Sequence, residues 1–285
     1  MKKLFNILFL IAIVYYANKL IVYMEYQDLP KVALPKDKKA IVVGATSGIG
    51  RQVAKELAKD GYEVGLIGRR LSLLHSLQKE IPTKTHIKQI DVSKMESAKE
   101  RLEEFITEMG GLDLMFVSVS AQGDIGAMEP TAKLDWQQVK KLVEVDVNGF
   151  WVSAYVAVKQ FEKQGHGHLV GVSSILKING SIAAPEYSGA KAFAGRYLDV
   201  IRNRMMKNKL PIYVTEIIPG PVDVERQKYS DLKGIFWVTT KEEAAKQIIQ
   251  AIRHKRKDAY ISKRWRLIAW VMSIMPDWLY RKIFP

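Results

Sequence analysis

The chain has 285 residues, of which 48% are hydrophobic and 26% are charged, and it contains no cysteine. This composition is typical of a globular protein and argues against a disordered chain, a collagen-like repeat or a disulfide-stabilised secreted domain. The absence of cysteine also excludes thiolate catalysis, cysteine-bound zinc and iron–sulfur clusters.

The formal net charge of +14 is concentrated at the two ends of the chain. Residues 1–24 carry +3 and residues 251–285 carry +7, whereas the 226 residues between them carry only +4. A nucleic-acid-binding protein would concentrate its basic residues on a recognition element of its domain. Here they lie among apolar and aromatic residues, which favours a membrane lipid surface as the partner and no nucleic acid.

The first segment, residues 4–24, is almost continuously apolar. As a helix it would be about 31 Å long, enough to cross the hydrocarbon core of a bilayer. Residues 15–17 form a poor signal-peptidase site, because the position three before the cut should be small. We therefore expect a membrane anchor at residues 1–24 and a linker at 25–37, with a cleaved signal or a buried helix as alternatives. The lysines at residues 31–39 place the following domain on the cytoplasmic side.

The last segment, residues 251–285, is predicted to be a basic amphipathic helical tail. Residues 264–275 combine arginine, tryptophan and aliphatic residues, and Pro276 is expected to end their helix. The apolar run is too short to span a bilayer but long enough to lie in its interface. Alternatively, the helix docks on the protein and covers a substrate pocket. The two interpretations are compatible.

Between these segments, strand-like and helix-like patterns alternate. The expected strands are residues 40–43, 62–67, 86–90, 112–119, 168–172 and 212–217, and the expected helices are 51–60, 71–80, 97–109, from 136 past 149, and from 187 onward. This alternation predicts an α/β fold with a doubly wound parallel sheet of the Rossmann type, in a domain spanning residues 38–250.

A glycine-rich turn, Gly44-Ala-Thr-Ser-Gly48-Ile-Gly50, joins the first strand to the first helix. Gly44 allows a tight exit from the strand, Gly48 lets backbone N–H groups approach a pyrophosphate, and Gly50 permits close helix–strand packing. The cofactor-binding residues expected here are Gly44, Thr46, Ser47, Gly48, Ile49 and Gly50.

The end of the second strand predicts which dinucleotide binds. An NAD-preferring site would place an acid there for the ribose hydroxyl, but this sequence has Arg69 and Arg70. A guanidinium pairs with a 2′-phosphate, so these two residues favour NADP(H). The alternative is that both arginines are solvated at the start of a helix.

Tyr187 and Lys191 are four residues apart and would share one face of a helix. A nearby ammonium group stabilises a phenolate and lowers the pKa of tyrosine from its usual value of about 10, which would suit acid–base catalysis. Ser174 follows a strand thirteen residues earlier, and its hydroxyl could hydrogen-bond a substrate carbonyl.

With the glycine turn, these residues resemble the short-chain dehydrogenase/reductase family over residues 38–225. The resemblance implies about seven strands, a hydride-transfer site made by Ser174, Tyr187 and Lys191, and ribose binding by Tyr187 and Lys191. In reduction, Tyr187 would donate a proton while NADPH gives the hydride. The resemblance also adds cofactor residues, with Asp91 and Val92 beside the adenine and Pro219, Gly220 and Val222 beside the nicotinamide.

Three parts of the chain depart from the family pattern, the first being Val43, where the family often has threonine. The family's Asn-Asn-Ala-Gly segment is replaced by Val117-Ser-Val-Ser120, and its catalytic asparagine aligns with Asp146. We expect Asp146 either to hold a relay water as asparagine does or to pair with Lys191. His166 and His168 lack an accompanying carboxylate cluster, so no metal site is expected.

The sequence therefore predicts NADPH-dependent reduction of a ketone or aldehyde on a hydrophobic, lipid-like substrate. One alternative is a dehydrogenase that oxidises a lipid, steroid or retinoid alcohol. Another is a membrane scaffold or redox sensor that binds NADP(H) with little turnover. The family resemblance allows a homodimer.

Overall fold

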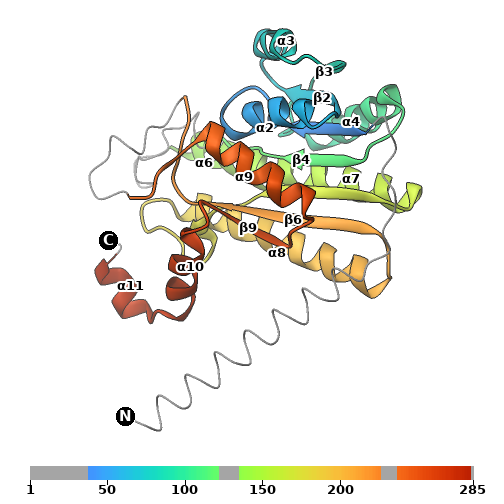
Figure 1. The fold of residues 1–285 in the computed structure, drawn as a ribbon. Coiled ribbons are helices and arrows are strands. Elements are labelled where there is room, and N and C mark those ends of the chain that lie inside the picture. The colour runs from blue at the N-terminus through green and yellow to red at the C-terminus, as the bar shows by residue number, and fades with distance from the viewer. Residues whose placement is uncertain (1–37, 122–134, 226–235, 284–285) are drawn as a thin grey trace.

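The computed structural model describes residues 38–121, 135–225 and 236–283 (Figure 1). The expected anchor at residues 1–24 and linker at 25–37 lie outside these ranges. Every helix within the described ranges is too short or too polar to cross a lipid bilayer.

The core of the molecule is one seven-stranded sheet in the order β3-β2-β1-β4-β5-β6-β9, with every neighbouring pair parallel. The strands are β1 (Lys39–Val43), β2 (Glu63–Gly68), β3 (Thr85–Gln89), β4 (Leu114–Val117), β5 (Gly167–Val172), β6 (Ile212–Pro219) and β9 (Asp258–Ile261). A separate short pair is formed by β7 (Val222–Asp223) and β8 (Thr239–Thr240). The chain reverses its winding between β1 and β4, so the predicted doubly wound sheet is confirmed.

Helices cover both faces of the sheet (Figure 1). One face packs against α4 (Met95–Met109), α7 (Phe150–Gln164) and α8 (Pro185–Lys207), and the other against α2 (Gly48–Lys59), α3 (Leu71–Glu80) and α9 (Lys241–Arg253). Two buried apolar layers result, and the central strands between them are buried on both sides, as their continuous runs of aliphatic residues require. The remaining helices are α6 (Trp136–Val143), α10 (Trp265–Ile274) and α11 (Asp277–Ile283).

The long helix expected from residue 136 onward is interrupted. A π-helical turn, Glu144–Gly149, separates α6 from α7. The wider turn contains Asp146, whose side chain is fully buried. Such turns are rare and occur frequently at functional sites.

The sheet extends past residue 250, where the sequence predicts the domain to end. That position lies inside α9, and β9 follows as the seventh strand, paired with β6. The four residues of β9 are short for a strand and follow a run of basic residues, so their pattern resembles the tail rather than the sheet.

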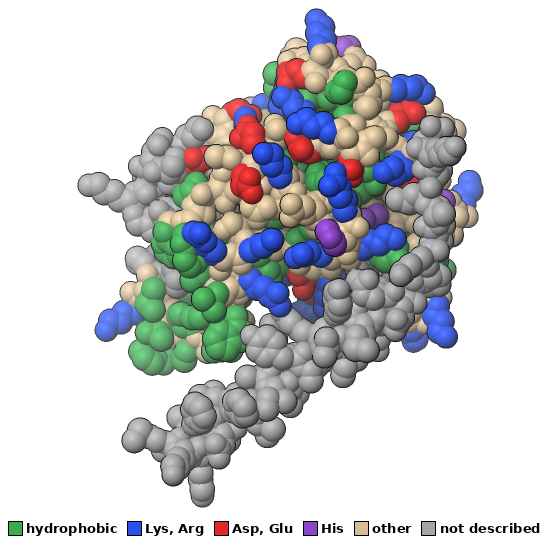
Figure 2. Space-filling view, in the orientation of Figure 1, with side chains coloured by type: hydrophobic (Ala, Val, Ile, Leu, Met, Phe, Trp, Pro, Cys, Tyr) green, Lys and Arg blue, Asp and Glu red, His purple; other side chains and the backbone are tan. Residues whose placement is uncertain are grey.

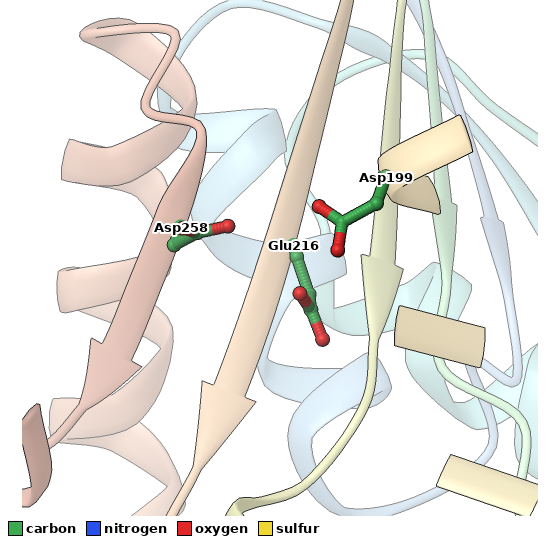
Figure 3. A group of neighbouring side chains, drawn as sticks. All are labelled: Asp199, Glu216 and Asp258. Carbon is green, nitrogen blue, oxygen red and sulfur yellow. The ribbon is translucent and has the colours of Figure 1, made fainter. Parts of the chain in front are cut away.

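A buried charge network holds β9 and α8 to β6. Arg202 has no exposed surface, donates from Nε to the Val214 carbonyl at 3.0 Å, and pairs with Asp199 at 2.6 Å. Figure 3 shows the carboxylates of Asp199, Glu216 and Asp258 converging from α8, β6 and β9. Arg202 also lies 3.7 Å from Asp258, and Lys177 lies 2.7 Å from Glu216, so each of the three carboxylates has a basic partner.

Candidate active site

A cavity of about 520 Å³ lies at the carboxyl ends of the strands, beside the reversal between β1 and β4. Fourteen residues predicted from the sequence line it: Gly44, Thr46, Ser47, Gly48, Ile49, Arg69, Arg70, Val92, Ser174, Tyr187, Lys191, Pro219, Gly220 and Val222. The other three predicted residues, Gly50, Asp91 and Asp146, are not among the described residues that line the cavity. The Asp91 carboxylate instead accepts hydrogen bonds from the Ser93 backbone and hydroxyl.

The glycine turn is shaped by close backbone contacts. A Cβ at Gly44, where φ is +91°, would lie 2.3 Å from the Ser118 carbonyl oxygen. A Cβ at Gly50 would lie 2.3 Å from the Gly44 carbonyl oxygen. Both positions therefore require glycine, and the turn brings the N-terminus of α2 to the cavity, where the first N–H groups of the helix favour an anion.

Arg70 lies directly beside this turn. Its guanidinium donates to the Thr46 hydroxyl at 2.7 Å and to the Ser47 hydroxyl at 2.9 Å. The positive charge of this side chain is thus held at the entrance to α2. The cavity wall at this end combines a cation with the N-terminus of a helix, which suits a phosphorylated ligand.

One residue at this end was not predicted from the sequence. The Glu225 carboxylate accepts a hydrogen bond from the Gly48 N–H at 2.9 Å and pairs with Lys241. Burial opposes ionisation, but the hydrogen bonds from Lys241 and Gly48 outweigh it and hold the pKa of Glu225 below its usual value. The Gly48 N–H is therefore already paired with a carboxylate, whose negative charge suits the N-terminus of α2.

Ser174 and Tyr187 meet at the other end of the cavity. Ser174 follows β5 in extended conformation, and its hydroxyl accepts a hydrogen bond from the Leu176 N–H at 3.2 Å. Tyr187 lies in the first turn of α8, which begins at Pro185. Burial and the charge of Asp146 raise the pKa of the Tyr187 phenol above its ordinary value of 10.0, and a hydrogen bond with Ser174 opposes this rise.

The predicted lowering of the Tyr187 pKa by Lys191 is therefore wrong for this structure. Lys191 Nζ lies 3.0 Å from Asp146 Oδ2 and 5.4 Å from the centre of the tyrosine ring. Both members of this ion pair are buried, with 3% and 0% of their side chains exposed. The carboxylate cancels the ammonium charge near the phenol, so pairing, one of the two alternatives expected for Asp146, is what the structure shows.

The unusual segment Val117-Ser-Val-Ser120 supports the site through its backbone. The Val119 carbonyl accepts from Lys191 Nζ at 3.1 Å, and the Ala121 N–H donates to Asp146 Oδ1 at 2.6 Å. These contacts do not depend on the side chains that differ from the family pattern. The loss of the family's asparagines and glycine therefore leaves the Lys191–Asp146 pair anchored.

The end of the chain closes one side of the cavity. Trp265 and Met272 of α10 and Tyr280 of α11 line it, and the Tyr280 hydroxyl donates to the Gly180 carbonyl. A Cβ at Gly220 would lie 2.4 Å from the Trp265 ring, so glycine allows this close packing. This is the arrangement described by the docking alternative, although whether the cavity holds the substrate stays a prediction. The individual lining residues were not predicted, because α10 is apolar on more than one face.

His166 and His168 do not line the cavity, and each contacts a neighbouring side chain. His168 in β5 is buried and lies 2.8 Å from the Thr215 hydroxyl, and burial, reinforced by the charge of Lys255, lowers its pKa to about 3. His166 lies 3.2 Å from Asp113.

The sheet order, the glycine turn and the position of the cavity define a Rossmann-type α/β protein, in which ligands bind outside the carboxyl ends of the strands. Residues 38–234 match the family model described as short chain dehydrogenase. The chain belongs to this family and is an oxidoreductase.

Its relatives and structural neighbours agree with this assignment. An uncharacterized oxidoreductase of Myxococcus xanthus is 31% identical over 231 residues, covering 80% of this chain and 88% of that protein. The uncharacterized oxidoreductase YxnA of Bacillus subtilis is 28% identical over 266 residues, covering 87% and 72%.

Solved structures share the fold at lower identity. A bulky-bulky ketone specific alcohol dehydrogenase from Comamonas testosteroni superposes with a TM-score of 0.68 at 18% identity, covering 85% of this chain and 96% of that one. A short-chain dehydrogenase from Sphingobium yanoikuyae in complex with NADPH gives a TM-score of 0.65 at 17% identity, covering 84% and 97%. A serine dehydrogenase complexed with NADP+ also gives 0.65, at 21% identity, covering 75% and 88%.

Proposed function

We propose that this protein uses NADPH to reduce a ketone or aldehyde on a hydrophobic substrate. The observation that carries the proposal is the arrangement of one cavity. An anion-binding glycine turn with Arg70 lies at one end, and Ser174 and Tyr187 lie at the other. A dinucleotide held by the first end would reach the second.

The choice of NADPH over NADH rests on Arg70. This guanidinium lies at the end of β2, where a 2′-phosphate would be recognised, and no acid replaces it there. Two structural neighbours, one bound to NADPH and one to NADP+, are consistent with this choice. When bound, NADPH would supply the hydride for the carbonyl carbon.

The remaining chemistry belongs to the side chains at the other end. We assign proton donation to the carbonyl oxygen to Tyr187 and a hydrogen bond to that oxygen to Ser174. Lys191 would hold the nicotinamide ribose, and Asp146 fixes the lysine from behind. The raised pKa of Tyr187 keeps the phenol protonated near neutrality, and a protonated phenol is the form required for reduction. Oxidation of an alcohol needs the phenolate, and the raised pKa makes that form scarcer at any given pH.

The substrate class follows from the wall next to Ser174 and Tyr187. Ile175 and Leu176 line it from the turn after Ser174, and Trp265 and Met272 line it from α10. These side chains favour an apolar group on either side of the carbonyl. The Comamonas neighbour is specific for bulky-bulky ketones, which suits the same interpretation.

We further propose that residues 1–24 tether the enzyme to a membrane, with the catalytic domain on the cytoplasmic side. The support is the apolar sequence 4–24 and the lysines that follow it. Protease protection in sealed vesicles would test the orientation. When the cytoplasmic face of the vesicle points outward, added protease should cleave a cytoplasmic domain, whereas a domain on the other side should be cleaved only after the vesicles are opened.

The decisive experiment is a substrate screen with the full chain in detergent. Medium- and long-chain ketones and aldehydes are offered with NADPH, and NADPH consumption is followed beside a Tyr187→Phe control. We expect turnover of at least one apolar carbonyl compound and a loss of about a thousandfold or more in Tyr187→Phe, since a general acid contributes about 10²–10⁴-fold. Tight NADPH binding without turnover by either protein would refute the reductase and favour the scaffold.

A further inference from the structure

We infer that α10 and α11 form a two-sided lid, whose inner face closes the cavity and whose outer face lies on an anionic lipid bilayer. An apolar carbonyl substrate then reaches the site from the lipid phase. The lid's contact with lipid stands on its own observations, whereas the route of the substrate rests on the proposed reductase activity.

The inner face is a regular stripe on α10. Trp265, Ala269 and Met272 are spaced as i, i+4 and i+7, so they lie on one side of the helix, and all three are buried. They belong to a small apolar cluster with Ile175, the residue after Ser174, and with Tyr280 of α11. This face is fully used in closing the cavity.

The outer face carries a second apolar stripe. Leu267, Val271 and Ile274 have the same spacing, and 61%, 37% and 60% of their surfaces are exposed. On α11, Trp278 and Ile283 are also exposed, by 64% and 51%. A helix at the surface of a globular protein normally presents polar residues opposite its buried side, so an apolar outer stripe indicates a second apolar environment.

The charges around this face select its partner. Lys263, Arg264 and Arg266 lie at the start of α10, and Arg281 and Lys282 lie near the end of α11. Asp277 is the only acid in residues 263–283. Basic residues and tryptophan that border an apolar stripe are the pattern of a helix that lies in a bilayer interface and attracts anionic headgroups.

Figure 2 shows the hydrophobic side chains gathered where α10 and α11 lie in Figure 1, with basic side chains at the border. A second copy of the chain fits this face poorly, because a two-fold contact would set two faces with the same excess of basic residues against each other. The bilayer is therefore the occupant that satisfies both the apolar stripe and the charge.

The lid is only one helix thick. Leu267 points outward and Trp265 inward on the same turn of α10, so lipid and cavity lie on opposite sides of a single element. A substrate dissolved in the bilayer would pass this helix without crossing water. This geometry points to long-chain or polycyclic carbonyl compounds that partition into lipid, rather than to small soluble ones.

The absence of cysteine gives a direct test of lipid contact. Full-length Ile274→Cys and Trp278→Cys are each labelled with a fluorophore and reconstituted in vesicles of phosphatidylcholine and phosphatidylglycerol that contain spin-labelled lipid. Glu100→Cys, exposed on α4, is the matched control. We expect the lipid to quench positions 274 and 278 about threefold more strongly than position 100, and less so without phosphatidylglycerol.

Equal quenching at all three positions would overturn the lipid contact. Energy transfer between labels on two molecules, without quenching by lipid, would show that a second copy covers the face and would also overturn it. Because this measurement needs no substrate, it decides the contact even if the reductase proposal fails.

The substrate route is tested by kinetics. In the double variant Leu267→Gln with Ile274→Gln, we expect KM for a long-chain ketone in vesicles to rise about tenfold while kcat is unchanged. The kinetic constants for a short water-soluble ketone should stay unchanged, because both side chains point away from the cavity. An equal rise in KM for both ketones, or an unchanged KM for both, would refute the route. Absence of turnover on every ketone in the unmodified enzyme would refute the proposed function instead.

Discussion

Asp146→Asn isolates the charge that sets this site apart from the family pattern. The amide oxygen can still accept the hydrogen bond from the Ala121 N–H, and Lys191 keeps the Val119 carbonyl. What disappears is the negative charge 3.0 Å from Lys191 Nζ. We therefore expect the site to keep its shape and most of its reductase activity while the Tyr187 phenol becomes more acidic.

The size of the effect follows from two distances. Lys191 Nζ lies 3.0 Å from the carboxylate and 5.4 Å from the centre of the Tyr187 ring, so carboxylate and ring are no more than about 8 Å apart. At an effective dielectric constant of about 20, two unit charges at this distance interact by about 2 kcal/mol. Removing the carboxylate should therefore lower the pKa of Tyr187 by about 1.5.

The assay compares both directions of the reaction. Reduction uses the protonated phenol and should stay within about tenfold of the unmodified enzyme at neutral pH. Oxidation uses the phenolate, whose fraction rises about 30-fold when the pKa falls by 1.5, although each phenolate is then a weaker base. We expect oxidation with NADP+ at pH 8–9 to rise about fivefold.

Two results would count against this reasoning. A loss of reduction beyond about a hundredfold, or about 2.7 kcal/mol of transition-state stabilisation, would mean that Asp146 does more than carry charge. Unchanged oxidation over the whole pH range would mean that its charge does not reach the phenol.

Three further changes test the cofactor end and the fold. Arg70→Ala should weaken NADPH binding about a hundredfold and NADH binding less than about threefold in calorimetric titrations; equal weakening would show that Arg70 does not recognise the 2′-phosphate. Glu225→Gln should tighten NADPH binding about fivefold, because the negative carboxylate that now accepts from the Gly48 N–H is replaced by a neutral amide. Weaker binding would contradict this. Arg202→Met should destabilise the fold by about 1–3 kcal/mol, since the Val214 and Lys257 carbonyls lose their hydrogen-bond donor, and thermal unfolding within about 2 °C of the unmodified protein would exclude it.

Local patterns predicted most of the sheet. The helix expected at residues 71–80 is observed as Leu71–Glu80, and the strand expected at 40–43 as Lys39–Val43. In these segments the spacing of apolar residues, the glycines and the charged residues all indicate the same element within a few residues of chain. β9 escaped prediction because its stability comes from pairing with β6 and from Arg202, contacts that join positions far apart in the sequence.

The residues of the site likewise fall into those that local motifs predict and those that depend on contacts between distant parts of the chain. Gly44, Gly50 and Tyr187 stand in short motifs whose spacing already implies their neighbours. The position of Glu225 on the Gly48 N–H joins residues 177 positions apart, and no local pattern announces it. The Lys191–Asp146 contact was one of two alternatives for the same reason: it joins residues 45 positions apart, and Asp146 stands in a π-helical turn that the sequence pattern did not predict.

The lid and Asp146 act on the same property of Tyr187. Burial is the largest cause of its raised pKa, and the Asp146 carboxylate is the second. Trp265, Met272 and Tyr280 wall the cavity that the phenol faces, so a closed lid keeps water out and holds the proton on the phenol. Opening the lid would hydrate the phenol and bring its pKa back toward 10. A closed lid therefore keeps Tyr187 in its protonated form, which is the form that must be present to donate a proton to a carbonyl oxygen.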